Sequence, residues 1–243
     1  MNALVRAVSA PFRDFIFPPL CFSCNARLKE TESRVCNSCW SSIEHIHSDD
    51  DTVQVLRQRF SDEGSIDEFY SCYYFEEKGV FQHLVHSLKY SAITLFGVEL
   101  GRHIGIMLRE NIDVHSIDAV IPIPLHKLKQ RERGYNQSEF ICKGISLVIE
   151  RPVVSTLVMR SKNTVSQTHL TADERKKNVG GAFEIRDAKK GFLKAKTILI
   201  VDDVITTGST IQSLAKLLKD AGVAKVIAAS AALAKLETSD PKK

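Results

Sequence analysis

The stretch "ILIVDDVITTGSTIQSL", residues Ile198–Leu214, runs from apolar residues through two carboxylates into a helical pattern. The apolar residues predict a buried strand over Thr197–Val201, and the periodic residues that follow predict a helix over Ser209–Ala221. Ligands of an open parallel sheet bind beyond the carboxyl ends of its strands. We therefore expect Asp202 and Asp203 to lie at a ligand-binding edge.

The two aspartates and the hydroxyl-rich run after them suit two parts of one ligand. Neighbouring carboxylates accept hydrogen bonds from a vicinal diol, such as that of a ribose, and also suit a magnesium shell. Both address one ligand only if the backbone turns between them, because adjacent side chains of a straight strand point to opposite faces. The following residues offer hydroxyls and N–H groups to a phosphate at a helix N-terminus: Thr206, Thr207, Gly208, Ser209 and Thr210.

The pattern thus predicts a cradle for a ribose 5-phosphate. The alternative is an ordinary Ser/Thr helix cap beside two solvated aspartates, and a cap accounts for only one of the hydroxyls. The sequence contains neither a P-loop motif nor a dinucleotide-binding glycine motif, which argues against those two nucleotide-binding sites.

Elsewhere, apolar strands alternate with amphipathic helices. This order predicts an α/β fold, a mostly parallel sheet flanked by helices. Strands are expected over Phe69–Phe75, Asp118–Ile123, Val153–Met159 and Val226–Leu233, and helices over Val80–Leu88, Leu95–Ile112 and Gln137–Ile149.

Four of the six cysteines form two Cys-x2-Cys pairs near the N-terminus: Cys21, Cys24, Cys36 and Cys39. Such a pattern predicts a closed, structural zinc site with four thiolate ligands. A disulfide or redox role is the alternative, although disulfides are rare in the cytosol. His45 and His47 are alternative ligands or simply solvated loop residues.

We expect two domains, an N-terminal segment with the zinc module over residues 1–60 and an α/β domain over residues 61–243. The polar residues around Asp49–Asp51 suggest a linker, with a short helix over Val53–Phe60. No apolar run reaches the ~18 residues of a membrane helix, and the N-terminus lacks a secretory pattern. The chain is therefore expected in the cytoplasm without a membrane span.

Charge is unevenly distributed along the chain. Residues 117–196 carry a net charge of +8, whereas residues 1–116 carry −5. The basic segment indicates an anionic ligand, and solvated surface lysines are the alternative.

The aspartate stretch closely resembles the phosphoribosyl pyrophosphate (PRPP) loop of type I phosphoribosyltransferases. Together with "PIPLHKLKQRERGYNQ" (Pro122–Gln137), "RSKNTVSQTHLTADERKKNVGGAF" (Arg160–Phe183) and the four cysteines, it resembles the ComF family over roughly residues 20–240. That family is associated with natural transformation in bacteria.

The resemblance implies roles for further residues. The loop after Ile123 would face pyrophosphate, with Arg131 and Arg133 as its main catalytic contacts and Gly134 opening the next helix. A hood loop would carry Arg160, Gln167 and Arg175 and exclude water from the activated sugar.

The implied function is a phosphoribosyltransferase-like protein that binds PRPP with Mg²⁺ and supports DNA uptake or processing. Its acceptor is not identified by any residue. The alternative is a non-catalytic adaptor that binds PRPP and single-stranded DNA, with Tyr135 and Phe140 as stacking candidates. Its zinc module would dock a competence helicase or a recombination mediator.

Overall fold

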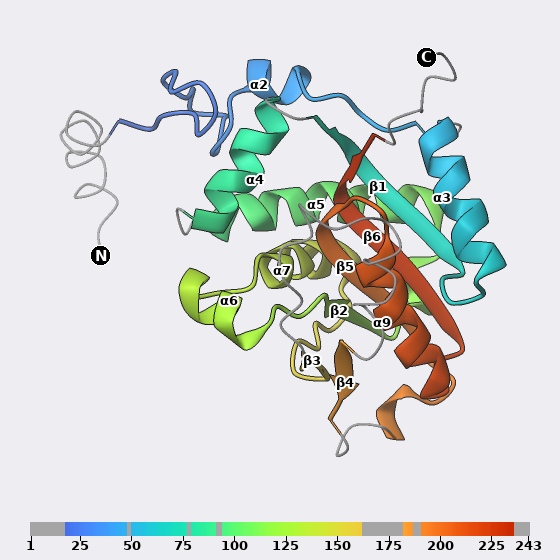
Figure 1. The fold of residues 1–243 in the computed structure, drawn as a ribbon. Helices are drawn as coiled ribbons and strands as arrows, with labels where there is room; N and C mark the ends of the chain where they lie inside the picture. The colour runs from blue at the N-terminus through green and yellow to red at the C-terminus, as the bar shows by residue number, and fades with distance from the viewer. Residues whose placement is uncertain are drawn as a thin grey trace, which may run out of the picture.

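The computed structural model describes residues 18–47, 50–76, 79–90, 94–161, 182–186 and 191–235. Its centre is a four-stranded parallel sheet in the order β1-β6-β5-β2 (Figure 1). The predicted fold class is confirmed. The sheet strands are β1 (Glu68–Phe75), β2 (Ala119–Pro122), β5 (Thr197–Ile205) and β6 (Lys225–Ala234), and a separate antiparallel pair joins β3 (Val158–Arg160) to β4 (Phe183–Ile185).

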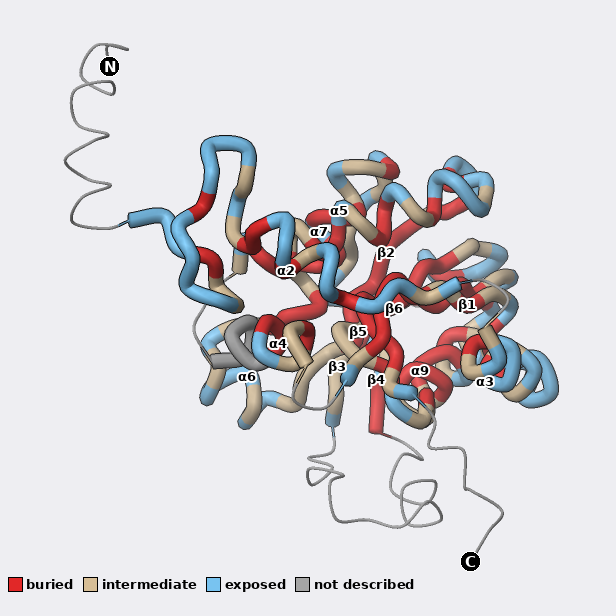
Figure 2. Tube along the Cα trace, turned by 90° about the horizontal axis from the view of Figure 1, so that it is seen from above, coloured by how far each residue is buried: buried red, intermediate tan, exposed pale blue. Residues whose placement is uncertain are grey.

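Helices cover both faces of this sheet. They are α2 (Asn37–Ser41), α3 (Asp51–Asp62), α4 (Val80–Tyr90), α5 (Thr94–Asn111), α6 (Lys127–Arg133), α7 (Gln137–Ile149) and α9 (Ser209–Asp220), with a 3₁₀ turn, η1, over Val114–Ser116. Figure 2 shows the buried residues concentrated along β5, β6 and β2. None of the described helices is both long enough and apolar enough to cross a membrane.

Alternating side chains of β5 divide the core into two layers. Leu199 and Val201 pack with α4, α5 and α7, whereas Ile198 and Ile200 pack with α3 and α9. All four side chains are fully buried, as expected for a strand covered on both faces.

Three sequence predictions about local structure are wrong. β5 does not end at Val201 but stays paired with β6 as far as Ile205, so both aspartates lie within the strand. The segment after Ile123 is a helix, α6, and Gly134 closes it in a left-handed conformation rather than opening the next helix. The strand predicted from Val153 begins only at Val158. Val153 itself forms only an isolated bridge, with Val120 of β2.

The helices α5 and α7 cross at almost direct backbone contact. A Cβ atom on Gly101 of α5 would overlap the carbonyl oxygen of Ile141, and one on Gly144 of α7 would overlap that of Val98. Only glycine fits at these two positions, and the contact fixes where α7 starts relative to the sheet.

We predict that Gly144→Ala destabilises the protein by about 3 kcal/mol, because the clash with α5 outweighs the gain in helix propensity. Gly191→Ala is the matched control, since a Cβ there meets nothing within 4 Å. Urea unfolding of both variants checks this, and equal midpoints would contradict the close packing.

The cysteine-rich module, described here from residue 18 to residue 47, packs against β1 and α5. Trp40 lies 4.6 Å from the His103 ring and 5.9 Å from Phe96, centroid to centroid. His103 Nδ1 lies 2.5 Å from the hydroxyl of Tyr73 on β1. The Ile46 N–H also donates to the Cys72 carbonyl, so the module is joined to the sheet edge through both backbone and side chains.

This cluster predicts a pH-dependent stability. Burial lowers the pKa of His103, and the nearby His45 lowers it further. The neutral ring is thus favoured in the folded state. The neutral His103 ring stabilises the folded protein fully above the unfolded-state pKa of about 6.5. This stabilisation is lost as the pH falls toward the lower folded-state pKa.

We therefore expect the urea midpoint of the native protein to fall more steeply between about pH 7 and about pH 5 than that of His103→Gln. His83→Gln is the control, because that histidine is exposed on α4. Parallel midpoint curves for the native protein and His103→Gln would rule out the buried neutral ring.

Candidate functional site

The two aspartates lie near the carboxyl end of β5, half-buried between the two core layers. Asp202 Oδ1 accepts hydrogen bonds from the Asp203 N–H at 2.9 Å and from the Ser138 hydroxyl at 3.3 Å. Asp203 Oδ1 accepts one from the Val204 N–H at 2.8 Å. Both carboxylates are thus anchored by hydrogen bonds from the protein.

The regular alternation of β5 is interrupted at this pair. Val201 and Val204 both contact the core layer of α5 and α7, although residues three apart on a straight strand point to opposite faces. Ile205 contacts the opposite layer. The alternation of side chains therefore changes around the pair, although β5 keeps its register with β6 as far as Ile205.

The loop from Thr206 leads directly into the N-terminus of α9. Gly208 is its N-cap residue, with φ of 75°, and no side chain caps the helix. The hydroxyls of Thr207 and Ser209 lie 2.9 Å apart and bond to each other instead. The ordinary helix cap considered from the sequence is thus not formed, and the helix start presents N–H groups suited to an anion.

Ser138 and Asn136 belong to this site and were not predicted from the sequence. Asn136 caps α7 by accepting from the Ser138 N–H, while its own amide donates to the Ile123 carbonyl at the end of β2. Since β2 pairs with β5, this places Ser138 within reach of Asp202. The signal that could have indicated them is the polar sequence Asn136-Gln137-Ser138 at the start of the predicted helix that follows the strand.

Arg160 is the described hood residue, and it lies close to the aspartates. Burial lowers the pKa of Arg160, while the Asp202 carboxylate acts in the opposite direction. The backbone of Arg160 forms an isolated parallel β-bridge with His126, the N-cap residue of α6. Its guanidinium lies 5.5 Å from the centre of the Phe183 ring. Gln167 and Arg175 lie outside the described residues.

Arg131 and Arg133 lie in the last turn of α6 rather than in a loop. Arg131 is exposed and Arg133 is half-buried. None of the seven residues of α6 is buried. The helix is therefore a surface element that follows β2, and it lies at the periphery of the molecule (Figure 1).

The four cysteines of the N-terminal module converge as predicted. The sulfurs of Cys21, Cys24, Cys36 and Cys39 all lie within 4.8 Å of one another, and all six cysteines of the chain are unbridged. Four converging thiols match a tetrahedral zinc site. His45 does not join this group; its ring stacks 4.8 Å from that of Tyr73.

Backbone groups around the cluster favour a thiolate at Cys21. Burial alone would raise its pKa, but N–H groups of Cys24, Cys36 and Ser23 outweigh that and lower it to about 6. Burial raises the pKa of Cys39 to about 12. These two shifts have opposite directions, so the fit to a thiolate-bound metal ion rests on the convergence of the four sulfur atoms.

Comparisons with known proteins find a family match for the α/β part of the molecule and another for the cysteine-rich part. Residues 145–243 match the phosphoribosyl transferase domain, and residues 12–49 match the double zinc ribbon domain. Competence protein F of Haemophilus influenzae is 35% identical over 130 residues, 52% of this chain and 56% of that protein. The resemblance to the ComF family is confirmed.

Two further relatives extend this result. DNA utilization protein YhgH of Salmonella typhimurium is 32% identical over 146 residues, 59% of this chain and 63% of that protein. Competence protein ComFC of Bacillus subtilis is 23% identical over 209 residues, 84% of this chain and 80% of that protein. The matches to the first two relatives span less than two thirds of those proteins' own lengths.

The zinc ribbon match and the cysteine cluster together support a structural zinc ion. We predict about one zinc ion per chain in protein purified under reducing, chelator-free conditions. Cys24→Ser should lose this zinc and lower the melting temperature by about 5 °C or more, because structural zinc contributes folding free energy.

Cys72→Ala is the control, since this buried thiol lies outside the cluster and bonds Met107. Elemental analysis and thermal unfolding measure the two effects. Zinc-free native protein, or equal zinc in both variants, would contradict the assignment.

Proposed function

We propose that this ComF-type chain binds PRPP, or a closely related ribose 5-phosphate, with Mg²⁺ at the carboxyl end of β5. The observation that carries the proposal is the sequence of groups there: two anchored carboxylates near the end of β5, followed by a helix N-terminus with no side-chain cap. The match to the phosphoribosyl transferase domain, which includes this loop, supports it. The competence-related relatives support a role in DNA uptake or processing.

The residues present fit the ligand and its metal ion. Carboxylate oxygens suit the hard Mg²⁺ ion, and the pair at Asp202 and Asp203 suits a ribose diol. The N–H groups after Gly208 suit the 5-phosphate, because they lie at a helix start that has no side-chain cap. Bound Mg²⁺ would supply charge neutralisation at the pyrophosphate.

The reaction class is displacement of pyrophosphate from the anomeric carbon of the ribose by an acceptor nucleophile. The aspartates would hold the sugar and need not move a proton. Arg131 and Arg133 would stabilise the charge that develops on the leaving pyrophosphate, which is electrostatic catalysis. Arg160, with Gln167 and Arg175 of the hood, would limit access of water to the activated sugar.

A titration of PRPP into the native protein, with and without Mg²⁺, tests the proposal. We expect saturable, magnesium-dependent binding that Asp203→Asn weakens by about tenfold or more, because the amide keeps the shape but loses the charge. Asp220→Asn is the control, since Asp220 is exposed at the far end of α9. Absence of binding by the native protein would overturn the proposal.

A non-catalytic adaptor remains the second candidate, favoured by the surface around α6. Four of the seven residues of α6 are basic. Nearby, Tyr135 and Phe140 stand edge to face at 5.6 Å, and Lys143 lies 4.3 Å from the Phe140 ring centre. Basic and aromatic side chains together suit single-stranded DNA.

Two assays separate the candidates. An enzyme releases pyrophosphate from PRPP when its acceptor is supplied, whereas the adaptor binds PRPP without turnover. The adaptor also binds single-stranded DNA with a steep salt dependence, and replacing the basic residues of α6 by glutamine weakens that binding. The zinc module would then offer the docking surface for a helicase or a recombination mediator.

A further inference from the structure

Helix α3 packs directly behind the proposed phosphate loop, although it precedes the first strand of the sheet. Arg59 Nη1 of α3 donates a hydrogen bond of 2.8 Å to the backbone carbonyl of Thr207, a residue 148 positions away in the chain. The sequence pattern predicts only a linker with a short helix in this region. No carboxylate or basic residue of the predicted site is involved.

A second contact fixes the same loop from the same helix. A Cβ atom on Gly208 would lie 2.7 Å from Cζ of Phe60, the residue after Arg59. Phe60 is fully buried, and its ring meets that of Phe69 on β1 edge to face at 5.5 Å. The ring therefore cannot withdraw from Gly208 without opening the core.

We propose that Arg59 is a positioning residue of the ligand site, acting through the Thr207 carbonyl. The inference rests on the proposed function, since it concerns the same loop. Because a peptide unit is planar and trans, a Thr207 carbonyl held from behind leaves the N–H group of Gly208 facing the opposite side, where the proposed ligand would lie. Holding the loop before binding reduces the entropy lost on binding.

Two of the three guanidinium nitrogens of Arg59 face other groups of the protein. Arg59 Nε lies 3.5 Å from Oε1 of Glu63, one turn further along α3, and the arginine side chain is 32% exposed. One end of the guanidinium thus faces an acidic side chain, while Nη1 faces the Thr207 carbonyl.

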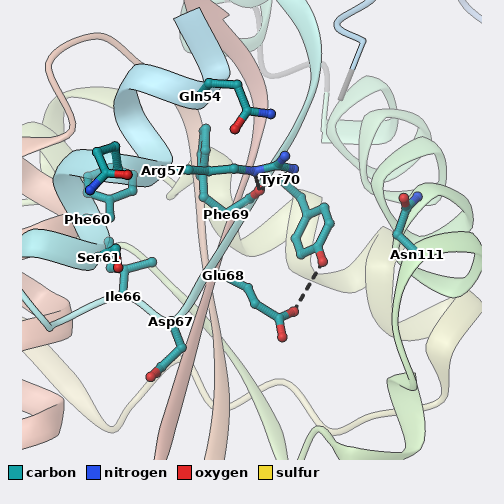
Figure 3. Close-up of a pocket in the computed structure, with 11 residues that line it drawn as sticks. Gln54, Arg57, Phe60, Ser61, Ile66, Asp67, Glu68, Phe69, Tyr70 and Asn111 are labelled. Carbon is teal, nitrogen blue, oxygen red and sulfur yellow. Dashed lines mark hydrogen bonds between the residues drawn. The ribbon is translucent and has the colours of Figure 1, made fainter. Parts of the chain in front are cut away.

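Arg57 on the same helix provides a matched control. It also donates to a backbone carbonyl, that of Phe69, with Nε at 3.3 Å and Nη2 at 3.2 Å. It lies in a pocket of about 490 Å³ along β1, next to Tyr70 and opposite Asn111 (Figure 3). This pocket is separated from β5 by β6, and of its lining residues only Phe60 also meets the proposed phosphate loop, at Gly208.

The experiment compares PRPP affinity in the presence of Mg²⁺ for full-length native protein, Arg59→Gln, Arg59→Lys and Arg57→Gln. We expect Arg59→Gln to weaken binding by about tenfold, as for the loss of one charge-assisted hydrogen bond, and Arg57→Gln to leave it unchanged. Arg59→Lys keeps a charged donor and should restore part of the affinity.

Amide hydrogen exchange separates positioning from general destabilisation. In the ligand-free protein, Arg59→Gln should speed exchange in a peptide spanning residues 206–210, while peptides from β5 and α7 exchange as in native protein. Thermal unfolding confirms that the Arg59 and Arg57 variants are similarly folded. Faster exchange throughout the molecule would overturn a local positioning role.

The outcomes distinguish the inference from the proposed function. If the native protein binds PRPP and Arg59→Gln binds it equally well, the positioning role is wrong and the proposed ligand stands. If the native protein binds no PRPP, the proposed function fails and the inference fails with it. Weakened binding with locally faster exchange supports both.

Discussion

The site depends on the position of β5 between two parallel neighbours. β6 pairs with it on one side and β2 on the other, and helices bury both of its faces. A strand held in this way has no freedom to shift, so the carboxylates near its end occupy fixed positions. Asn136 then links the end of β2 to the start of α7, which brings Ser138 to Asp202.

The sequence predicted the elements whose signals are local. The helix over Gln137–Ile149 agrees with α7 residue for residue, and the four cysteines converge as their spacing indicated. Both signals lie within short stretches of sequence, where hydrophobic periodicity or the spacing of ligands depends only on neighbouring residues. The fold class followed from the alternation of strand-like and helix-like stretches along the chain.

Features that depend on distant partners were not predictable in the same way. Val53–Phe60 was recognised as a short helix, but nothing in its own sequence shows that Arg59 meets Thr207 or that Phe60 meets Gly208. The end of β5 was placed too early because two aspartates look like a strand end. Pairing with β6 continues the strand in spite of them, since the backbone bonds do not depend on side-chain polarity.

The contact between the cysteine-rich module and the sheet has an optical consequence. Trp40 is the single tryptophan of the chain, and it lies in that contact against His103. The intrinsic tryptophan fluorescence of the whole protein therefore comes from one known position at the junction of the two parts. Its emission maximum reports whether the module is seated against the sheet.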